Sequence, residues 1–226
     1  MWHTRVVKFD DRMKHFVPRF IALIFGLFLY ALGIVLTINA NIGYAPWEVF
    51  HVGLSFKAGF SIGVASIFVG LAIVAIVVVC REKIGLGTVL NMILIGVFLD
   101  LIFFLNIIPR TNNLVIGIAM LVAGLFVISL GSFFYIKAGF GAGPRDSLMV
   151  LLNRKTKIPV GICRSALELA VTAAGWFLGG MVGIGTVISV VAIGFCIQIT
   201  FAILKFIPAE VKHETIAETY KKIKKK

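Results

Sequence analysis

The sequence predicts an all-α, polytopic transmembrane helix bundle of about six spans, built from two inverted three-helix repeats. Three observations support this prediction: long apolar blocks, basic residues confined to certain connections, and Gly, Pro and Thr residues that recur at a fixed offset. Of the 226 residues, 60% are hydrophobic and 14% are charged. A soluble domain has about 45–50% apolar and about 25% charged residues. We therefore expect a single integral membrane domain over residues 1–226.

The apolar blocks predict where the chain crosses the lipid bilayer. Each block is about 20 residues long, enough to cross a hydrocarbon core about 30 Å thick. The alternation expected of barrel strands is absent, so the spans are predicted to be helices that satisfy their own backbone groups. The predicted spans are 16–38, 60–80, 85–107, 114–136, 158–178 and 182–207. The first follows a long polar segment, which indicates a retained helix rather than a cleaved signal peptide.

The basic residues predict the orientation of these spans. With six spans, residues 1–19, 81–83, 137–157 and 205–226 share one side, and they carry nineteen of the 22 Lys and Arg residues. The opposite side carries Lys57 and Arg110, and Arg164 falls inside a span. Cytoplasmic segments are enriched in Lys and Arg. We therefore expect a multi-pass cell-membrane protein with cytoplasmic basic tails at 1–15 and 209–226. Anionic lipid, not nucleic acid, is the expected neighbour of the C-terminal lysines.

An internal repeat organises the chain. Segment 31–50 aligns with segment 129–148 without a gap, and the register holds through 84–90 against 182–188. The pairs at this single offset include Gly33 with Gly131, Gly43 with Gly141, Pro46 with Pro144, and Glu48 with Asp146. Repeat 1 covers about 16–108 and repeat 2 about 114–207. Since each holds three spans, the second copy must enter the membrane from the opposite side. Many secondary transporters share this plan, with a binding site near the midplane.

Each repeat carries one Gly/Pro motif in its longest connection. Proline suits the first position of a helix, and an acid suits the first turn. Short helices are therefore predicted at about 46–56 and 144–153. They are either re-entrant elements that line a cavity or interfacial turns with Trp47 among the headgroups. The candidate gate residues are Gly43, Pro46, Glu48, Gly141, Pro144, Arg145 and Asp146.

These motifs carry a family resemblance. The stretches PWEVFHVGLS, REKIGLGT, GAGPRDSLM and GGMVGIGT resemble the YczE/YyaS/YitT family of bacterial membrane proteins over most of residues 25–200. Glu48 stands where the family pattern has Asp, which keeps the charge. The resemblance implies a polytopic membrane protein, and it implies no substrate and no catalytic residue.

Charged residues inside the spans are candidates for function, because a charge in the bilayer core is unfavourable. Arg164 and Glu168 are four residues apart, so they share one helix face and can pair. They form either a structural ion pair or a site for a substrate or coupling ion. Asp100 and Gln198 occupy equivalent repeat positions, and they either line a path or form interhelical hydrogen bonds.

The sequence supplies no pattern for catalysis or for a cofactor. The three cysteines, Cys80, Cys163 and Cys196, lie in apolar stretches and form no CxxC pair, so neither a disulfide nor a metal site is expected. The G-x-G-T motifs at 85–88 and 183–186 lack the lysine of a phosphate loop, and close helix packing or a hinge is expected instead. We expect no enzyme and no cofactor.

Two functions from different classes fit these features. The first is a permease-like carrier of a small solute, with Arg164 attracting an anionic group. The second is a membrane scaffold or assembly factor, with structural charges and a partner protein bound at the cytoplasmic face.

Overall fold

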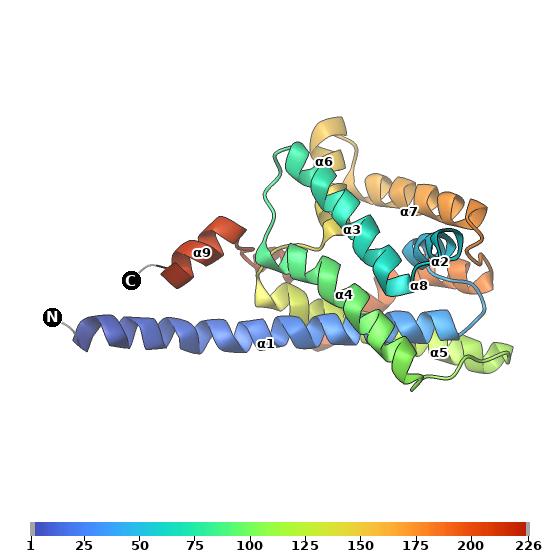
Figure 1. Ribbon diagram of the computed structural model, residues 1–226, viewed down its shortest axis with the longest axis horizontal. Coiled ribbons are helices and arrows are strands. Elements are labelled where there is room, and N and C mark those ends of the chain that lie inside the picture. Colours follow the sequence, from blue (N-terminus) through green and yellow to red (C-terminus); the bar gives the residue numbers. More distant parts are fainter. Residues whose placement is uncertain (1–2, 225–226) are drawn as a thin grey trace.

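The computed structural model describes residues 3–224, and every regular element within that range is a helix (Figure 1). The predicted all-α class is thereby confirmed. The elements are α1 (His3–Asn39), α2 (Pro46–Ala58), α3 (Ile62–Val79), α4 (Leu86–Leu105), α5 (Leu114–Ala138), α6 (Pro144–Thr156), α7 (Val160–Phe177), α8 (Ile184–Ile203), η1 (Pro208–Glu210) and α9 (Ile216–Lys224).

Within the described residues, six helices are long and apolar enough to cross a membrane: α3, α4, α5, α7, α8 and the Phe16–Asn39 part of α1. They match the six predicted spans. The sixth prediction was wrong at its end, because α8 stops at Ile203 and not at residue 207. Lys205 turns the chain with a positive φ of 49°, ahead of Pro208. Helix α1 begins at His3, ahead of its apolar part, which begins at Phe16 as predicted.

The sequence repeat returns in the helix boundaries. The first and last residues of α2, α3 and α4 recur in α6, α7 and α8 at the offset that relates Gly43 to Gly141. Pro46 and Pro144 begin the two short helices, as expected of proline at a first helical position. The chain therefore contains the same three-helix order twice.

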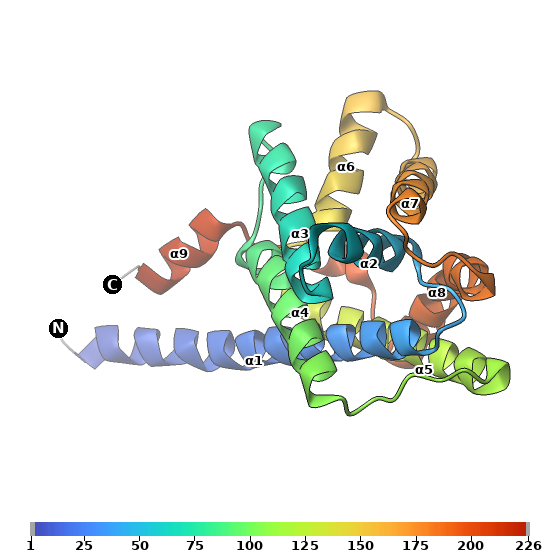
Figure 2. The same ribbon diagram turned by 45° about the vertical axis from the view of Figure 1, so that its right-hand side comes forward.

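Helices α1 and α5, which are equivalent in the two repeats, pack along each other (Figures 1 and 2). A Cβ added to Gly26 would lie 2.8 Å from the carbonyl oxygen of Gly131, and one added to Gly33 would lie 2.7 Å from that of Gly124. Small residues allow such close backbone approach between membrane helices. These pairs make α1 and α5 antiparallel. An inverted repeat requires this relation, while the orientation in the membrane stays a prediction.

The G-x-G-T motifs join the repeats to each other. The N–H of Gly87 donates to the Phe140 carbonyl, and the equivalent N–H of Gly185 donates to the Ile42 carbonyl, both at 2.7 Å. Each G-x-G-T motif therefore rests on the Gly/Pro loop of the other repeat. The contact leaves no room for a Cβ, since one at Gly85 would lie 2.0 Å from the carbonyl oxygen of Phe140.

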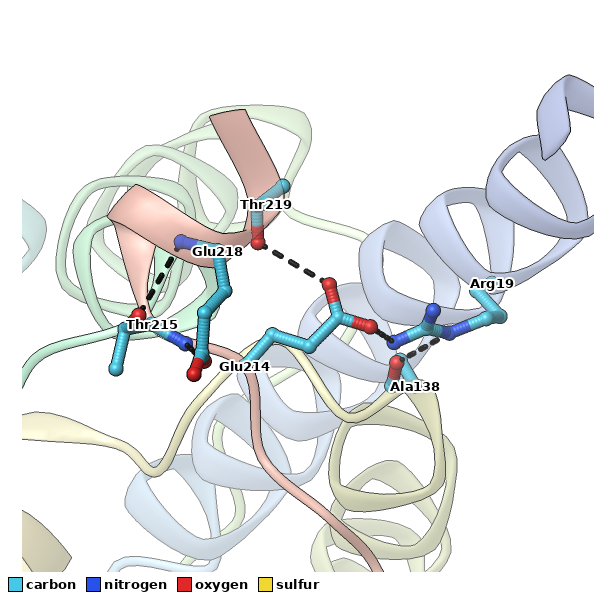
Figure 3. A network of polar contacts seen from close by, with 6 residues as sticks. All are labelled: Arg19, Ala138, Glu214, Thr215, Glu218 and Thr219. Atoms are coloured by element: carbon cyan, nitrogen blue, oxygen red, sulfur yellow. Dashed lines mark hydrogen bonds and ion pairs between the residues drawn. The ribbon is translucent and has the colours of Figure 1, made fainter. Parts of the chain in front are cut away.

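The C-terminal segment crosses one end of this bundle (Figure 3). Arg19 donates from Nε to the Ala138 carbonyl at 2.9 Å and pairs through Nη2 with Glu214 at 2.8 Å. The N–H of Glu214 donates to the Gly139 carbonyl at 2.8 Å. These contacts hold the segment before α9 against α1 and the end of α5. Helix α9 and the start of α1 lie on the same side of the molecule (Figures 1 and 2).

Candidate functional site

A cavity of about 120 Å³ lies where the two repeats meet. Helices α1 to α7 all contribute to its wall, including Tyr30 from α1 and Tyr135 from α5. None of the described residues of α8, Ile184–Ile203, lines it. The cavity is therefore built by the tertiary fold and by no single sequence segment.

Equivalent residues of the two repeats face this cavity from both sides. Five equivalent pairs contribute: Trp47 with Arg145, His51 with Met149, Ser66 with Arg164, Val69 with Leu167, and Gly70 with Glu168. In three of these pairs, repeat 2 has the charged residue where repeat 1 has Trp, Ser or Gly. The backbone scaffold is thus symmetric, while the charge lies on the side formed by α6 and α7.

The first turns of α2 and α6 meet at the cavity wall. Arg145 Nη2 lies 3.5 Å from Glu48 Oε1, and the guanidinium carbon of Arg145 lies 4.8 Å from the centre of the Trp47 ring. The Glu48 side chain is 7% exposed and that of Arg145 is 28% exposed. Arg145 therefore balances a buried carboxylate and keeps part of its guanidinium accessible. Trp47 lies in this cluster, whereas the interfacial-turn alternative expected it among lipid headgroups.

Asp146, the residue after Arg145, has a different partner. The hydroxyl of Tyr135 donates to Asp146 Oδ2 at 2.9 Å. The ring of Tyr135 lies edge-on to that of Tyr30, with 6.3 Å between ring centres. Asp146 is also in the first turn of α6, where a carboxylate suits the helix dipole. This side of the cavity is therefore lined by Tyr30, Tyr135 and Asp146, and the hydroxyl of Tyr135 fixes the position of the Asp146 carboxylate.

Arg164 and Glu168 face the cavity from α7. The Nε of Arg164 donates to Glu168 Oε1 at 2.9 Å, which is the pair expected from their spacing. The Arg164 side chain is 48% exposed, and that of Glu168 is 18% exposed. Only part of the guanidinium is used by Glu168, so the remaining N–H groups of Arg164 are available to a second acceptor.

His51 and Asn91 line the cavity, and sequence reasoning gave neither a leading role. His51 is 2% exposed, and its ring centre lies 6.4 Å from that of Trp47. No hydrogen bond joins the His51 ring to any residue within 3–224. The ring nitrogens of His51 are not among the fully buried polar atoms that lack a partner, so the imidazole is accessible from the cavity. The only sequence signal was its position one helical turn after Glu48.

Most other predicted site residues lie away from the cavity wall. Asp100 accepts from Ser61 Oγ at 2.5 Å and from the N–H of Gly63 at 2.9 Å, so it holds the start of α3. Gln198 is exposed on α8. Gly43 and Gly141 have φ values of 114° and 119° and support the loops before α2 and α6. Pro144 touches the cavity and Pro46 does not. In the described range, no three His, Cys, Asp or Glu side chains are grouped as metal ligands.

The comparisons with known proteins place the chain in one family of membrane proteins. Residues 17–201 match the model of a family described as "Family of unknown function (DUF6198)". The chain belongs to this family. Its relatives include the "Uncharacterized membrane protein YczE" of Bacillus subtilis, 38% identical over 76% of this chain and 80% of that protein. This confirms the resemblance read from the motifs, and the protein is a multi-pass membrane protein.

Two further relatives extend the family. An "Uncharacterized protein" of Haemophilus influenzae is 31% identical over 82% of this chain and 84% of that protein. The "Uncharacterized protein YyaS" of Bacillus subtilis is 25% identical over 80% of this chain and 90% of that protein. No solved structure matches the chain.

Proposed function

We propose that this protein is a carrier in the cell membrane for a small solute that bears an anionic group. The observation that carries the proposal is the cavity between the repeats, whose wall holds two arginines and a histidine with no hydrogen-bond partner among the described residues. Ionisable residues within transmembrane bundles commonly mark solute or ion pathways. A repeated helix order with a site between the copies is also the plan of many secondary transporters.

Arg145 and Arg164 are the proposed anion-binding residues. They stand on different helices, α6 and α7, and both face the cavity. Each has an acidic partner, Glu48 or Glu168, so neither charge is unbalanced when the site is empty. Arginine presents five donors in a planar fork that fits carboxylate and phosphate groups. An anionic group placed between the two guanidinium groups could accept from the N–H groups that their glutamates leave unused.

The size and remaining wall of the cavity limit the solute. A cavity of about 120 Å³ is close to the engineered cavity of about 150 Å³ that accepts benzene. A compact molecule with few heavy atoms therefore fits better than a nucleotide or a lipid. His51 and Asn91 supply further polar contacts, while Met92 and Met149 supply adaptable apolar surface. Coupling to a cation would involve the carboxylates Glu48, Asp146 and Glu168.

The test is a thermal-shift screen of the detergent-solubilised protein against small carboxylates, phosphates and inorganic anions. A ligand present at about 100 times its dissociation constant stabilises the folded state by about 2.7 kcal/mol. The same screen is run on Arg164→Gln and Arg145→Gln. The matched control is Arg154→Gln, because Arg154 also pairs with a glutamate, Glu82, but lies outside the cavity and is 65% exposed.

We expect one class of anion to stabilise the wild type and Arg154→Gln, and to lose that effect in both cavity variants. Uptake of this anion into proteoliposomes then tests transport. Binding without uptake, or the absence of any stabilising anion over a broad set, would contradict the carrier proposal. The alternative would then be a scaffold that binds a partner protein through Arg154, Lys155, Lys157 and the C-terminal tail.

A further inference from the structure

The two repeats differ at one interface, although their helix boundaries match. In repeat 1, α3 packs along α4 (Figure 1). In repeat 2, the equivalent helices α7 and α8 have almost no contact beyond the short connection that joins them. Helix α4 also lines the cavity through Asn91, Met92 and Ile95, whereas its equivalent α8 lines none of it. In repeat 1 the last two helices are therefore packed together beside the cavity, whereas in repeat 2 the last two helices are apart.

The closed interface depends on three residues, which we call the first latch: Gly63, Gly96 and Asp100. A Cβ added to Gly63 would lie 2.1 Å from the carbonyl oxygen of Gly96, and one added to Gly96 would lie 2.5 Å from that of Gly63. Asp100 accepts from the N–H of Gly63 at 2.9 Å. The two helices thus touch backbone to backbone, and a carboxylate on α4 bonds to the first turn of α3.

The equivalent residues of repeat 2, the second latch, are Gly161, Gly194 and Gln198. No atom lies within 4 Å of a Cβ added to Gly161 or Gly194, so both glycines face open space. Gln198 is exposed and has no hydrogen-bond partner within the described part of the chain. Glycine weakens a helix relative to alanine. Neither glycine gains a compensating contact in this conformation.

A second unsatisfied group lies on α8. The hydroxyl of Ser189 is buried without a hydrogen-bond partner among the described residues. Its equivalent in repeat 1 is Asn91, which faces the cavity. The two glycines lack the packing, and Gln198 lacks the hydrogen bond, that their equivalents in repeat 1 have, while Ser189 lies outside the cavity that Asn91 faces. A single movement of α8 toward α7 and the cavity would remove these differences.

We infer that the protein has a second conformation in which the two interfaces exchange: Gly161 packs against Gly194, and Gly63 separates from Gly96. In that conformation the Gln198 side-chain oxygen accepts from the N–H of Gly161, and Ser189 takes the position at the cavity that Asn91 has here. The two conformations open the cavity at opposite ends. The present one opens along α7 and α8, near the segment 137–157 that is expected in the cytoplasm. The role we give to the second conformation rests on the proposed carrier function, because a carrier must expose its binding site to each side of the membrane in turn.

The experiment measures distances between helices and needs no solute. Spin labels are placed on α7 and α8 at positions 162 and 199, and in a second protein on α3 and α4 at the equivalent positions 64 and 101, in a cysteine-free background in lipid nanodiscs. Ile162, Ile199 and Leu101 are exposed. We expect a long and a short population for each pair, the short one with helix axes about 8–10 Å apart. The short α7–α8 population accompanies the long α3–α4 population.

Reciprocal substitutions decide the assignment. Asp100→Ala removes the two hydrogen bonds that Asp100 accepts from Ser61 and Gly63, without adding bulk. We expect it to raise the short α7–α8 population about tenfold. Gln198→Ala should lower the same population, because its bond exists only in the second conformation. Gly194→Leu fits this conformation, where the space is open, and should abolish the short α7–α8 population in a protein that remains folded.

The outcomes separate this inference from the proposed function. One unchanged population in the wild type and in all three variants overturns the exchange, even if an anion binds. Two populations in the wild type, with the short α7–α8 population raised by Asp100→Ala and lowered by Gln198→Ala, support the exchange, even if no anion is found. If dilution with unlabelled protein removes the short α7–α8 distance, that distance joins two copies, and the exchange within one chain is overturned.

Discussion

The guanidinium of Arg145 lies 3.5 Å from the carboxylate of Glu48, and each residue belongs to the first turn of a helix that begins with proline. The two helices, α2 and α6, are equivalent in the two repeats. This ion pair therefore joins the Gly/Pro motifs directly across the site. The two motifs are separated by nearly half of the chain, and only the packing of one repeat against the other brings them together.

Arg145→Gln should destabilise the protein more than Glu48→Gln does. It leaves a carboxylate buried without a cation, whereas Glu48→Gln leaves an arginine that is 28% exposed and still stacked on Trp47. Loss of one partner of a fully buried pair costs about 3–5 kcal/mol. The partial exposure of Arg145 reduces the expected loss to about 2 kcal/mol. Thermal unfolding in detergent measures it. The double variant should recover part of the loss, and strictly additive effects would show that the two side chains do not interact.

Tyr135→Phe should weaken both the protein and the site. The substitution removes the only hydroxyl that donates to Asp146 among the described contacts, and a hydrogen bond to a charged group contributes about 1.5–3 kcal/mol. Tyr30→Phe is the matched control, because Tyr30 lines the same cavity with no hydrogen bond to another described residue. Equal unfolding temperatures for the two variants would contradict a structural role for the Tyr135–Asp146 bond.

Gly141→Ala should destabilise the fold far more than Gly59→Ala, although both glycines have positive φ values. A Cβ added to Gly59, at φ 70°, would meet only open space, so an alanine there costs only about 1–2 kcal/mol of backbone strain. Gly141, at φ 119°, would in addition place its Cβ 2.7 Å from the Gly85 Cα. Yield of folded protein and thermal unfolding compare the two. Similar behaviour would indicate that the contact between Gly141 and the G-x-G-T motif contributes little.

Glu214→Gln should destabilise the protein by about 1 kcal/mol or more, whereas Glu82→Gln should have little effect. Both glutamates pair with an arginine, at 2.8 Å for Arg19 and 2.6 Å for Arg154. Arg19 is 35% exposed and also binds the Ala138 carbonyl, while Arg154 is 65% exposed. Exposed ion pairs contribute about 0–1 kcal/mol. Thermal unfolding and limited proteolysis of the C-terminal segment provide the measurement, and a larger effect at Glu82 would be the contrary result.

Single cysteines at Lys57 and Lys155 should react with an impermeant thiol reagent from opposite sides of the membrane. Lys57 and Lys155 are the next-to-last residues of α2 and α6, so the two positions are equivalent in the repeats, and both are exposed. An inverted relation places them on opposite faces. In intact cells, a cysteine-free background with Lys57→Cys should be labelled and Lys155→Cys protected. Labelling of both from outside would exclude the inverted repeat.

Much of the fold could be predicted because its signals are local. The length of each apolar block, the prolines at Pro46 and Pro144, and the spacing of Arg164 and Glu168 act within one helix or one turn. The offset between Gly43 and Gly141 likewise needs no knowledge of contacts. The end of α8 was missed because apolar residues continue to Ile207. The helix ends at a turn at Lys205, and a positive φ is not indicated by a lysine in the sequence.

The sequence by itself determined the helical class, the six apolar helices, the repeat and the Arg164–Glu168 pair. Only the tertiary structure decided that Arg145 meets Glu48, that His51 and Asn91 face a common cavity, and that Asp100 bonds to α3 instead of lining that cavity. It also decided that Gly63 and Gly96 touch while Gly161 and Gly194 do not. The physical reason is that periodicity and charge act along the chain. Contacts between distant segments depend on how the helices approach one another, and the same glycine pattern is compatible with an open interface and with a closed one.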